Sequence, residues 1–185
     1  MNIFVVSSTA AKRHAQAFIK GCSHLEVSFL TWWDQFIAGK TLLEDLTRIR
    51  KEIDRAILIL SPDSRATLDR GDQPIPNLNV LFEFGFFYGA LGPDKVAVVR
   101  YGQIYLPSNL GGYIHIVGSE RFTPRRAVPV GKRTRSEFER WLKPPQSSNG
   151  LTVEQVLARV TSRKRAQTAE VEQVIARLKV VPTLG

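Results

Sequence analysis

Cysteine, histidine and long apolar runs are all scarce in this chain. A single cysteine, Cys22, stands among 185 residues, so the chain can form no internal disulfide and offers no cysteine-based zinc site. The three histidines lie in separate segments without the spacing of a zinc motif. No apolar run approaches the ~20 residues of a transmembrane helix, and the N-terminus lacks the basic flank and length of a signal peptide. We therefore expect a soluble, cytoplasmic protein.

The common phosphate-binding and nucleophile motifs are also missing. The chain has no G-x-x-x-x-G-K-[ST] and no G-x-G-x-x-G after its first apolar run, so ATP hydrolysis and hydride transfer lack their usual phosphate cradles. It has no G-x-S-x-G elbow for a Ser–His–Asp hydrolase. His14, beside Lys12 and Arg13, is predicted to be a surface residue, and His115 in "YIHIV" to be a strand residue.

Positive charge is concentrated in the last third of the chain. Residues 1–120 hold 12 Lys/Arg and 12 Asp/Glu, whereas residues 121–185 hold 14 and 5, which supplies the whole net charge of +9. A basic segment of this kind indicates an acidic partner such as nucleic acid, or else a solvated tail that keeps the protein soluble.

Strand-like and helix-like segments alternate along the first 120 residues. The predicted strands are apolar, rich in β-branched residues and bounded by Ser, Pro or Gly; they are 2–7, 25–30, 55–60, 95–100 and 113–118. Helices are predicted over 9–21, over 41–53, with Thr41 and Glu44 as a capping box, and over 77–92. This order predicts a parallel sheet with helices on both faces.

Small polar residues follow the first and third predicted strands. Ser7, Ser8 and Thr9 follow the first strand, and Ser61 and Asp63 follow the third. Doubly wound sheets bind ligands beyond the carboxyl ends of their strands, so these side chains are candidates for ligand binding. The alternative is that they cap the next helices. We expect capping for Thr9, and either role for Ser8 and Asp63.

The composition changes after residue 120. A helix over 134–143 is predicted to bury Phe138, Trp141 and Leu142, and "PPQSSNG" (144–150) has the composition of a linker. Beyond it, "VEQVLARV" (153–160) is repeated as "VEQVIARL" (171–178). The offset of 18 residues equals five helical turns, so a continuous helix and a helical hairpin are both compatible with the repeat.

A single carboxylate interrupts the most apolar stretch, "NLNVLFEFGFFYGALG" (77–92). Glu83 shares a helix face with Asn79 and Phe87, and the helix is apolar in nearly every direction, which predicts packing on nearly every side. Gly85 and Gly89 permit close backbone approach at about 1 kcal/mol each relative to Ala. A carboxylate in this setting is either a functional residue or half of a structural pair with an Arg.

Several motifs occur together in an order that resembles one protein family. They are "FVVSS", "WWDQF" (32–36), "TLLEDL" (41–46), "DRAILILSPD" (54–63), "NVLFEFGFFYGALG" (79–92) and "LPSNLGG" (106–112). Over about residues 2–118 the chain resembles the predicted nucleotide-binding TIR-like domains of bacterial anti-phage effectors, including the TIR part of bacterial TIR–STING proteins. It departs from the family at Asn77-Leu78, where Arg-Asp is common, and at Pro93, where Arg is frequent.

The resemblance implies a flavodoxin-like, TIR-type five-stranded sheet, followed here by a C-terminal helical extension. It also implies cleavage of the nicotinamide–ribose bond of NAD⁺, switched on by self-association and linked to a sensing module. NAD⁺ is then the substrate, and no cofactor or metal is expected. Glu83 becomes the catalytic residue. The substrate-binding residues become Ser7, Ser8, Trp33, Phe36, Asp63 and Asn79.

Domain boundaries and two other functions complete the expectations. The TIR-like domain is predicted over 1–143, the linker over 144–150 and the basic helical extension over 151–185. One alternative function is a nucleoside deoxyribosyltransferase-like enzyme. The other is a non-catalytic TIR-like scaffold whose basic tail recruits a partner, which includes nucleic acid.

Overall fold

Regular structure follows the alternation of apolar and amphipathic segments. The computed structural model describes residues 1–143 except 70, 107–109 and 111–114. Its strands are β1 (Asn2–Ser7), β2 (Ser28–Thr31), β3 (Arg55–Leu60), β4 (Ser64–Leu68), β5 (Gly71–Ile75), β6 (Val96–Tyr101) and β7 (His115–Ser119). Its helices are α1 (Lys12–Cys22), α2 (Trp32–Gln35), α3 (Leu42–Ile49), α4 (Leu78–Leu91), a 3₁₀ turn η1 (Pro93–Lys95) and α5 (Lys132–Leu142).

Five of the strands form one parallel sheet in the order β2-β1-β3-β6-β7. The strand order reverses between β1 and β3, which is the flavodoxin-like arrangement with its ligand crevice at that point. This confirms the predicted fold class. The predicted bounds of β1 and β3 agree with the structure, whereas β2 begins three residues later than predicted.

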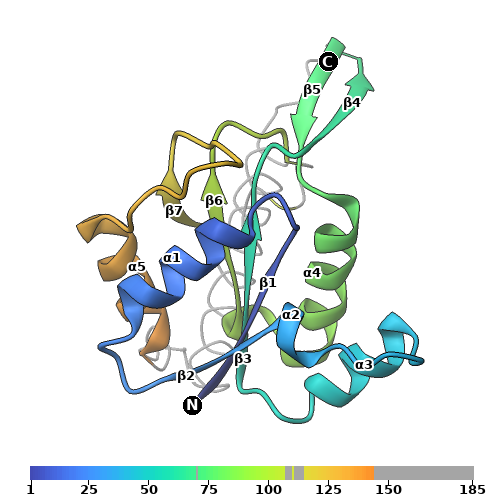
Figure 1. Cartoon of the computed structure of the whole chain (residues 1–185), viewed down its shortest axis with the longest axis vertical. Coiled ribbons are helices and arrows are strands. Elements are labelled where there is room, and N and C mark those ends of the chain that lie inside the picture. Colours follow the sequence, from blue (N-terminus) through green and yellow to red (C-terminus); the bar gives the residue numbers. More distant parts are fainter. Residues whose placement is uncertain (70, 107–109, 111–114, 144–185) are drawn as a thin grey trace, which may run out of the picture. The chain divides into compact units, whose positions relative to one another are not determined.

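Helices cover both faces of this sheet (Figure 1). Side chains that alternate along the strands divide the core into two clusters. Ile3, Val5, Ile57 and Ile59 pack under α1 and α5. Phe4, Val6, Leu58 and Val98 pack under α3 and α4. The inner strands are therefore buried on both faces, as their unbroken apolar sequences predict.

A two-stranded antiparallel hairpin, β4–β5, was not predicted from the sequence. It pairs Ser64 with Ile75 and Leu68 with Gly71, and in Figure 1 it extends beyond the carboxyl end of β3. The Tyr105 N–H donates to the Pro74 carbonyl at 2.7 Å, which holds the hairpin against the segment after β6. Its sequence is polar and contains Pro, so it lacks the apolar alternation that identifies a strand.

Helix starts agree with the sequence in one case and differ in another. The capping box at α3 is confirmed, because the Thr41 hydroxyl accepts the Glu44 N–H and the Glu44 carboxylate accepts the Thr41 N–H. The predicted cap by Thr9 is wrong. Thr9 is exposed, and the Ser8 hydroxyl accepts the Ala11 N–H at 3.1 Å instead. Since α1 starts at Lys12, Thr9 lies too far upstream to cap it.

The predicted surface position of His14 is also wrong. His14 is fully buried, with its ring 4.8 Å from those of both Tyr101 and Phe122. The α1 face that carries it packs on the sheet, while Lys12 and Arg13 lie towards its edge and exterior. Neither ring nitrogen of His14 has a hydrogen-bond partner in the described part of the chain, and burial lowers the pKa of this imidazole.

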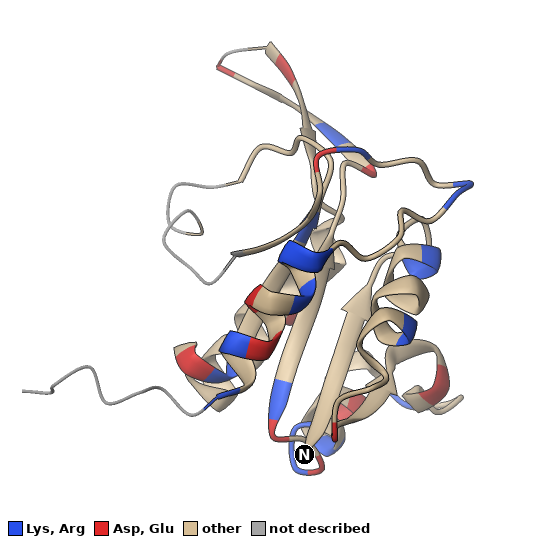
Figure 2. Ribbon diagram, turned by 90° about the vertical axis from the view of Figure 1, so that its left-hand side faces the viewer, with Lys and Arg blue, Asp and Glu red and all other residues tan. Residues whose placement is uncertain are grey.

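The predictions for the C-terminal part can be compared with the structure only up to residue 143. Helix α5 buries Phe138 and Trp141 and half-buries Leu142, as predicted. Figure 2 shows Lys and Arg on α1, on α5 and on the loop between β7 and α5, while the sheet is nearly free of charge. The linker over 144–150 and the extension over 151–185 lie outside the described residues, so these boundaries stay a prediction. In the described segments, no helix has the length and apolarity to cross a membrane.

Candidate active site

The carboxylate of Glu83 lies in the second turn of α4. Val80, Phe84 and Phe87 of the same helix pack into the core under the sheet, and Glu83 itself is 7% exposed. Burial raises the pKa of Glu83 to about 7, because a charged carboxylate loses hydration there. Over the described residues no hydrogen bond or ion pair reaches this carboxylate. The structural pairing with an Arg, which the sequence left open, is therefore not formed by this part of the chain.

The start of α4 is tied to the carboxyl end of β3. Asn77 caps the helix, since its side-chain oxygen accepts the Asn79 N–H at 2.9 Å. The Asn77 N–H in turn donates to Asp63 Oδ1 at 3.1 Å. This bond closes the base of the β4–β5 hairpin and sets the distance between Glu83 and the strand ends. Asp63 thus has a positioning contact, and its ligand-binding role stays a prediction.

Two polar atoms beside this connection are buried without a hydrogen-bond partner among the described residues. They are Asp63 Oδ2 and the hydroxyl of Ser61, which lies immediately after β3. Buried polar groups normally have hydrogen-bond partners, so unpartnered ones at the carboxyl end of a central strand mark this region as functionally interesting. The sequence indicates Ser61 as a candidate either for ligand binding or for capping the next helix.

At the carboxyl end of β1, Ser7 and Ser8 have separate partners. The Trp32 indole N–H donates to Ser7 Oγ at 3.1 Å. Ser8 accepts the Ala11 N–H, as described above, so it serves the start of α1. Both serines are nearly buried. The structure accounts for one hydrogen bond at each hydroxyl and leaves their predicted substrate contacts untested.

The two adjacent tryptophans begin α2 and contact each other edge to face, with ring centres 5.7 Å apart, while each also packs with a different core cluster. Trp33 packs with the cluster under α1 and α5, and Lys12 Nζ lies 4.9 Å from the centre of its ring. Trp32 packs with the cluster under α3 and α4, which is the side of Glu83, and its ring lies 6.3 Å from that of Phe36. The sequence favoured Trp33 for the site. Trp32 is the one that packs with the cluster of α3 and α4, and the substrate-binding role expected of Trp33 stays a prediction.

Phe36 and Asn79 line the outside of this region. Phe36 is 39% exposed and Asn79 is also exposed, one helical turn before Glu83. Both side chains are free to meet a ligand. Trp32, Phe36 and Glu83 therefore belong to one side of the sheet, and Ser7 connects Trp32 to the carboxyl end of β1.

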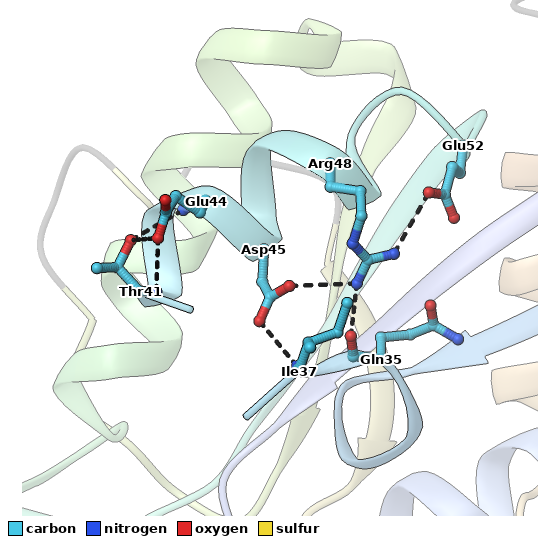
Figure 3. Close-up of polar contacts among 7 residues, drawn as sticks. All are labelled: Gln35, Ile37, Thr41, Glu44, Asp45, Arg48 and Glu52. Atoms are coloured by element: carbon cyan, nitrogen blue, oxygen red, sulfur yellow. Dashed lines mark hydrogen bonds and ion pairs between the residues drawn. The ribbon is translucent and has the colours of Figure 1, made fainter. Parts of the chain in front are cut away.

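A buried carboxylate fixes the segment between α2 and α3 (Figure 3). Asp45 Oδ2 accepts the Ile37 N–H at 3.0 Å, and Asp45 Oδ1 accepts from Arg48 at 3.3 Å. Arg48 also donates to the Gln35 carbonyl at 2.5 Å. These bonds hold the chain on both sides of Phe36 against α3. Asp45 was not identified from the sequence, although a charge three residues after Leu42 on the apolar face was a usable signal.

No metal-binding cluster accompanies these residues. Within the described ranges, no three His, Cys, Asp or Glu side chains are placed to hold a metal ion together.

Comparison with known proteins gives the family. Residues 2–119 match the family described as "CAP12/Pycsar effector protein, TIR domain". The chain is 31% identical over 147 residues to the Pycsar effector protein PaPycTIR of Pseudomonas aeruginosa, which covers 75% of this chain and 47% of that protein. It is 36% identical over 88 residues to CD-NTase-associated protein 12 of Sphingobacterium faecium, which covers 47% of this chain and 27% of that protein.

Solved structures add a more distant likeness. A diflavin flavoprotein A3 from Nostoc sp. aligns at 18% identity with a TM-score of 0.39, over 76% of this chain and 87% of the other. This chain spans less than half the length of the two curated relatives named above. The match over residues 2–119 confirms the resemblance seen in the sequence motifs: the chain belongs to the CAP12/Pycsar effector TIR domain family.

Proposed function

We propose that this domain cleaves the nicotinamide–ribose bond of NAD⁺ and hydrolyses the resulting ribosyl group. One observation carries the proposal. Glu83 is a buried carboxylate without a partner in the described chain, beside the strand-order reversal where flavodoxin-like sheets bind nucleotides. Keeping such a group costs stability, and active sites are the places where that cost is offset by function.

The chemistry needs one carboxylate and no general acid. When the glycosidic C–N bond breaks, its electron pair moves to the pyridinium nitrogen, so nicotinamide leaves as a neutral molecule. Positive charge develops on the ribose, and the Glu83 carboxylate stabilises it at short range in a medium of low dielectric constant. Water then bonds to the ribosyl carbon and releases a proton, which Glu83 or solvent accepts. Stabilisation of the cation and transient nucleophilic attack by Glu83 both fit this scheme.

The surrounding residues have complementary roles in the proposal. Trp32 and Phe36 offer aromatic surface for the nicotinamide or adenine ring. Ser7, Ser8, Asp63 and Asn79 are candidates for the ribose hydroxyls. Trp33, favoured by the family resemblance, is expected to act through packing, because it contacts the cluster under α1 and α5 and supports the Trp32 ring edge to face.

The biological role extends the same proposal to the protein around this domain. The family and the names of the relatives support an effector role in anti-phage defence. We extend the proposal to depletion of NAD⁺ when a sensing module detects its signal. Self-association is expected to raise the activity. In PaPycTIR the matched segment makes up 47% of the protein, so the proposed sensing module is sought in a further domain or in a separate protein.

Nicotinamide release from NAD⁺ tests the proposal directly. We expect turnover by the wild type at high protein concentration and a loss of at least 100-fold in Glu83→Gln, which keeps shape and removes charge. Glu120→Gln, on the exposed partner of Arg100, is the matched control and is expected to retain activity. Full activity in Glu83→Gln would refute the proposed role of Glu83. Reaction with free deoxynucleosides but not NAD⁺ would favour the deoxyribosyltransferase alternative.

A further inference from the structure

One side of α4 is exposed and is not covered by any other described segment of the chain. The sequence predicts a helix packed on nearly every side, yet Leu78 is 66% exposed and Phe82 is 50% exposed. A Cβ atom added to Gly85 or Gly89 would meet nothing within 4 Å. These four residues follow the spacing i, i+4, i+7 and i+11, so they form a single stripe along the helix, which we call the α4 stripe.

The α4 stripe differs from an ordinary solvent-facing helix surface. The only charged residue of α4 is Glu83, and it is buried, so no charge stands on the outward side. Surface helices normally carry polar and charged residues there, and contiguous exposed apolar residues mark interaction sites. Glycine is also unfavourable inside a helix unless another backbone must come close. Nothing in the described chain approaches Gly85 or Gly89, so the close approach is left for another molecule.

We propose that the α4 stripe pairs with the α4 stripe of a second copy of this chain, with the two helices antiparallel. In that orientation one two-fold axis places Leu78 of each copy on Gly89 of the other, and Phe82 on Gly85. The Leu78 and Phe82 side chains of each copy then fill the space beside Gly89 and Gly85 of the other copy. A parallel pairing would instead oppose Phe82 to Phe82 and leave the glycines facing an empty space.

Charge favours a second copy as the occupant. The net charge of +9 comes from residues 121–185, whereas residues 1–120, which include the α4 stripe, hold 12 Lys/Arg and 12 Asp/Glu, so two copies can approach through this part without net repulsion. The uncharged α4 stripe is a place where they can meet without opposing like charges. The same residue set supplies both the projecting side chains and the gaps, which is the self-complementarity that a two-fold interface requires.

The size of the stripe predicts a weak dimer. From Leu78 to Gly89 the helix rises about 17 Å, so the stripe alone covers far less than the ~800 Å² per partner of a standard stable interface. Pairing should therefore depend on concentration. Glu83 lies on the same helix, towards the opposite side, so pairing would fix the helix that carries this carboxylate. That last step rests on the proposed function, whereas the pairing itself does not.

Sedimentation of the full 185-residue chain over a range of concentrations tests the pairing. We expect reversible dimers in the wild type and at least tenfold weaker association in Phe82→Glu. Leu43→Glu on α3, where Leu43 is 53% exposed, is the matched control and should associate like the wild type. Gly85→Phe should also abolish the dimer, because the introduced phenyl ring would oppose Phe82 of the second copy. The exchange Phe82→Ala with Gly85→Phe should restore it, since each large side chain again faces a small one.

Each outcome of these experiments either supports or overturns the proposed pairing. Wild type that stays monomeric at the highest concentration overturns the pairing, and this includes the case in which another protein or a membrane covers the stripe. Equal loss in Phe82→Glu and Leu43→Glu places the contact outside α4 and also overturns it. Circular dichroism of every variant checks that α4 stays folded. NAD⁺ cleavage is measured in parallel: dimers without turnover would refute the proposed function alone, and turnover in monomers would refute the pairing as its regulator.

Discussion

The Asp63 carboxylate accepts the backbone N–H of Asn77 at 3.1 Å, across the entire β4–β5 hairpin. Asp63 follows the central strand β3, and Asn77 caps the helix that carries Glu83. The bond therefore joins the carboxyl end of the sheet to the start of α4. It is the most direct connection found between the crevice of this fold and the candidate catalytic helix.

Removal of this bond is expected to lower stability. Asp63→Ala leaves the Asn77 N–H without its acceptor, and we expect a loss of about 1–2 kcal/mol in the free energy of unfolding. Asp63→Asn keeps a carbonyl oxygen in place and should lose less. Urea denaturation measures both. Asp72→Ala, which removes a hydrogen bond with Thr67 on the exposed hairpin, is the control and should change stability by less than about 0.5 kcal/mol. Equal effects at both sites would contradict a special role for Asp63.

The rate of NAD⁺ cleavage should depend on the ionisation of Glu83. Burial raises the pKa of Glu83 to about 7, and the proposed chemistry uses the charged form. We expect kcat/KM to rise about tenfold per pH unit below pH 7 and to level off above it, since this parameter reports the free enzyme. A profile that is flat from pH 5 to 8 would show that Glu83 does not act as an anion.

The same carboxylate should cost stability at high pH. Its folded pKa of about 7 lies above the value of 4.5 for an exposed Glu, so the folded state binds the proton more tightly. The stabilisation from protonated Glu83 is fully present below about pH 4.5 and is lost as pH rises through about 7. Glu83→Gln cannot ionise and should be more stable than the wild type by about 3 kcal/mol at pH 8. Near pH 4.5 we expect no advantage, and thermal unfolding at both pH values is the measurement.

The two tryptophans should differ in kinetics. Trp32→Phe removes the N–H that binds Ser7 and alters the aromatic surface on the Glu83 side, so we expect kcat/KM to fall about tenfold. Trp33→Phe changes packing in the cluster under α1 and α5 and keeps an aromatic ring beside Trp32, so it should lower kcat/KM by less than Trp32→Phe does. Steady-state kinetics on both variants, after confirmation of equal folding, makes the comparison. The reverse order would support the assignment that the family resemblance gave.

Acid should destabilise the domain through His14. Burial lowers the pKa of His14 in the folded state, so the unfolded chain binds the proton more readily. The contribution of neutral His14 is fully present above pH 6.5 and declines as pH falls below that value. His14→Phe should fill the space between Tyr101 and Phe122 and remove this decline.

The control for this prediction is His24→Phe, at an exposed position beside Glu139. Urea midpoints from pH 7 to 5 should change with pH in the same way for His24→Phe and the wild type. Comparison between variants cancels the opposite pH dependence of Glu83, which is present in all three proteins. An unchanged pH slope in His14→Phe would show that His14 does not titrate on unfolding.

The sequence by itself determined the sheet, the family and the candidate carboxylate. Apolar runs such as 2–7 and 55–60 are stable as strands that are covered on both faces of a sheet. The local sequence pattern is enough to identify them. The capping box at Thr41 and Glu44 is equally local, because its partners are three residues apart. Glu83 stood out since a lone charge in an apolar helix is costly wherever that helix packs.

Tertiary structure decided the features that depend on distant neighbours. His14 is buried because Tyr101 and Phe122 surround it, and neither lies near it in the sequence. The polar β4–β5 hairpin forms between two ends joined by Asp63 and Asn77, without apolar alternation to reveal it. Trp32 packs with the core cluster that includes α4 and Trp33 with the cluster that includes α1, because α2 begins immediately after β2, which no spacing rule showed. Local patterns specify elements, but the direction in which a side chain faces is set by what packs against it.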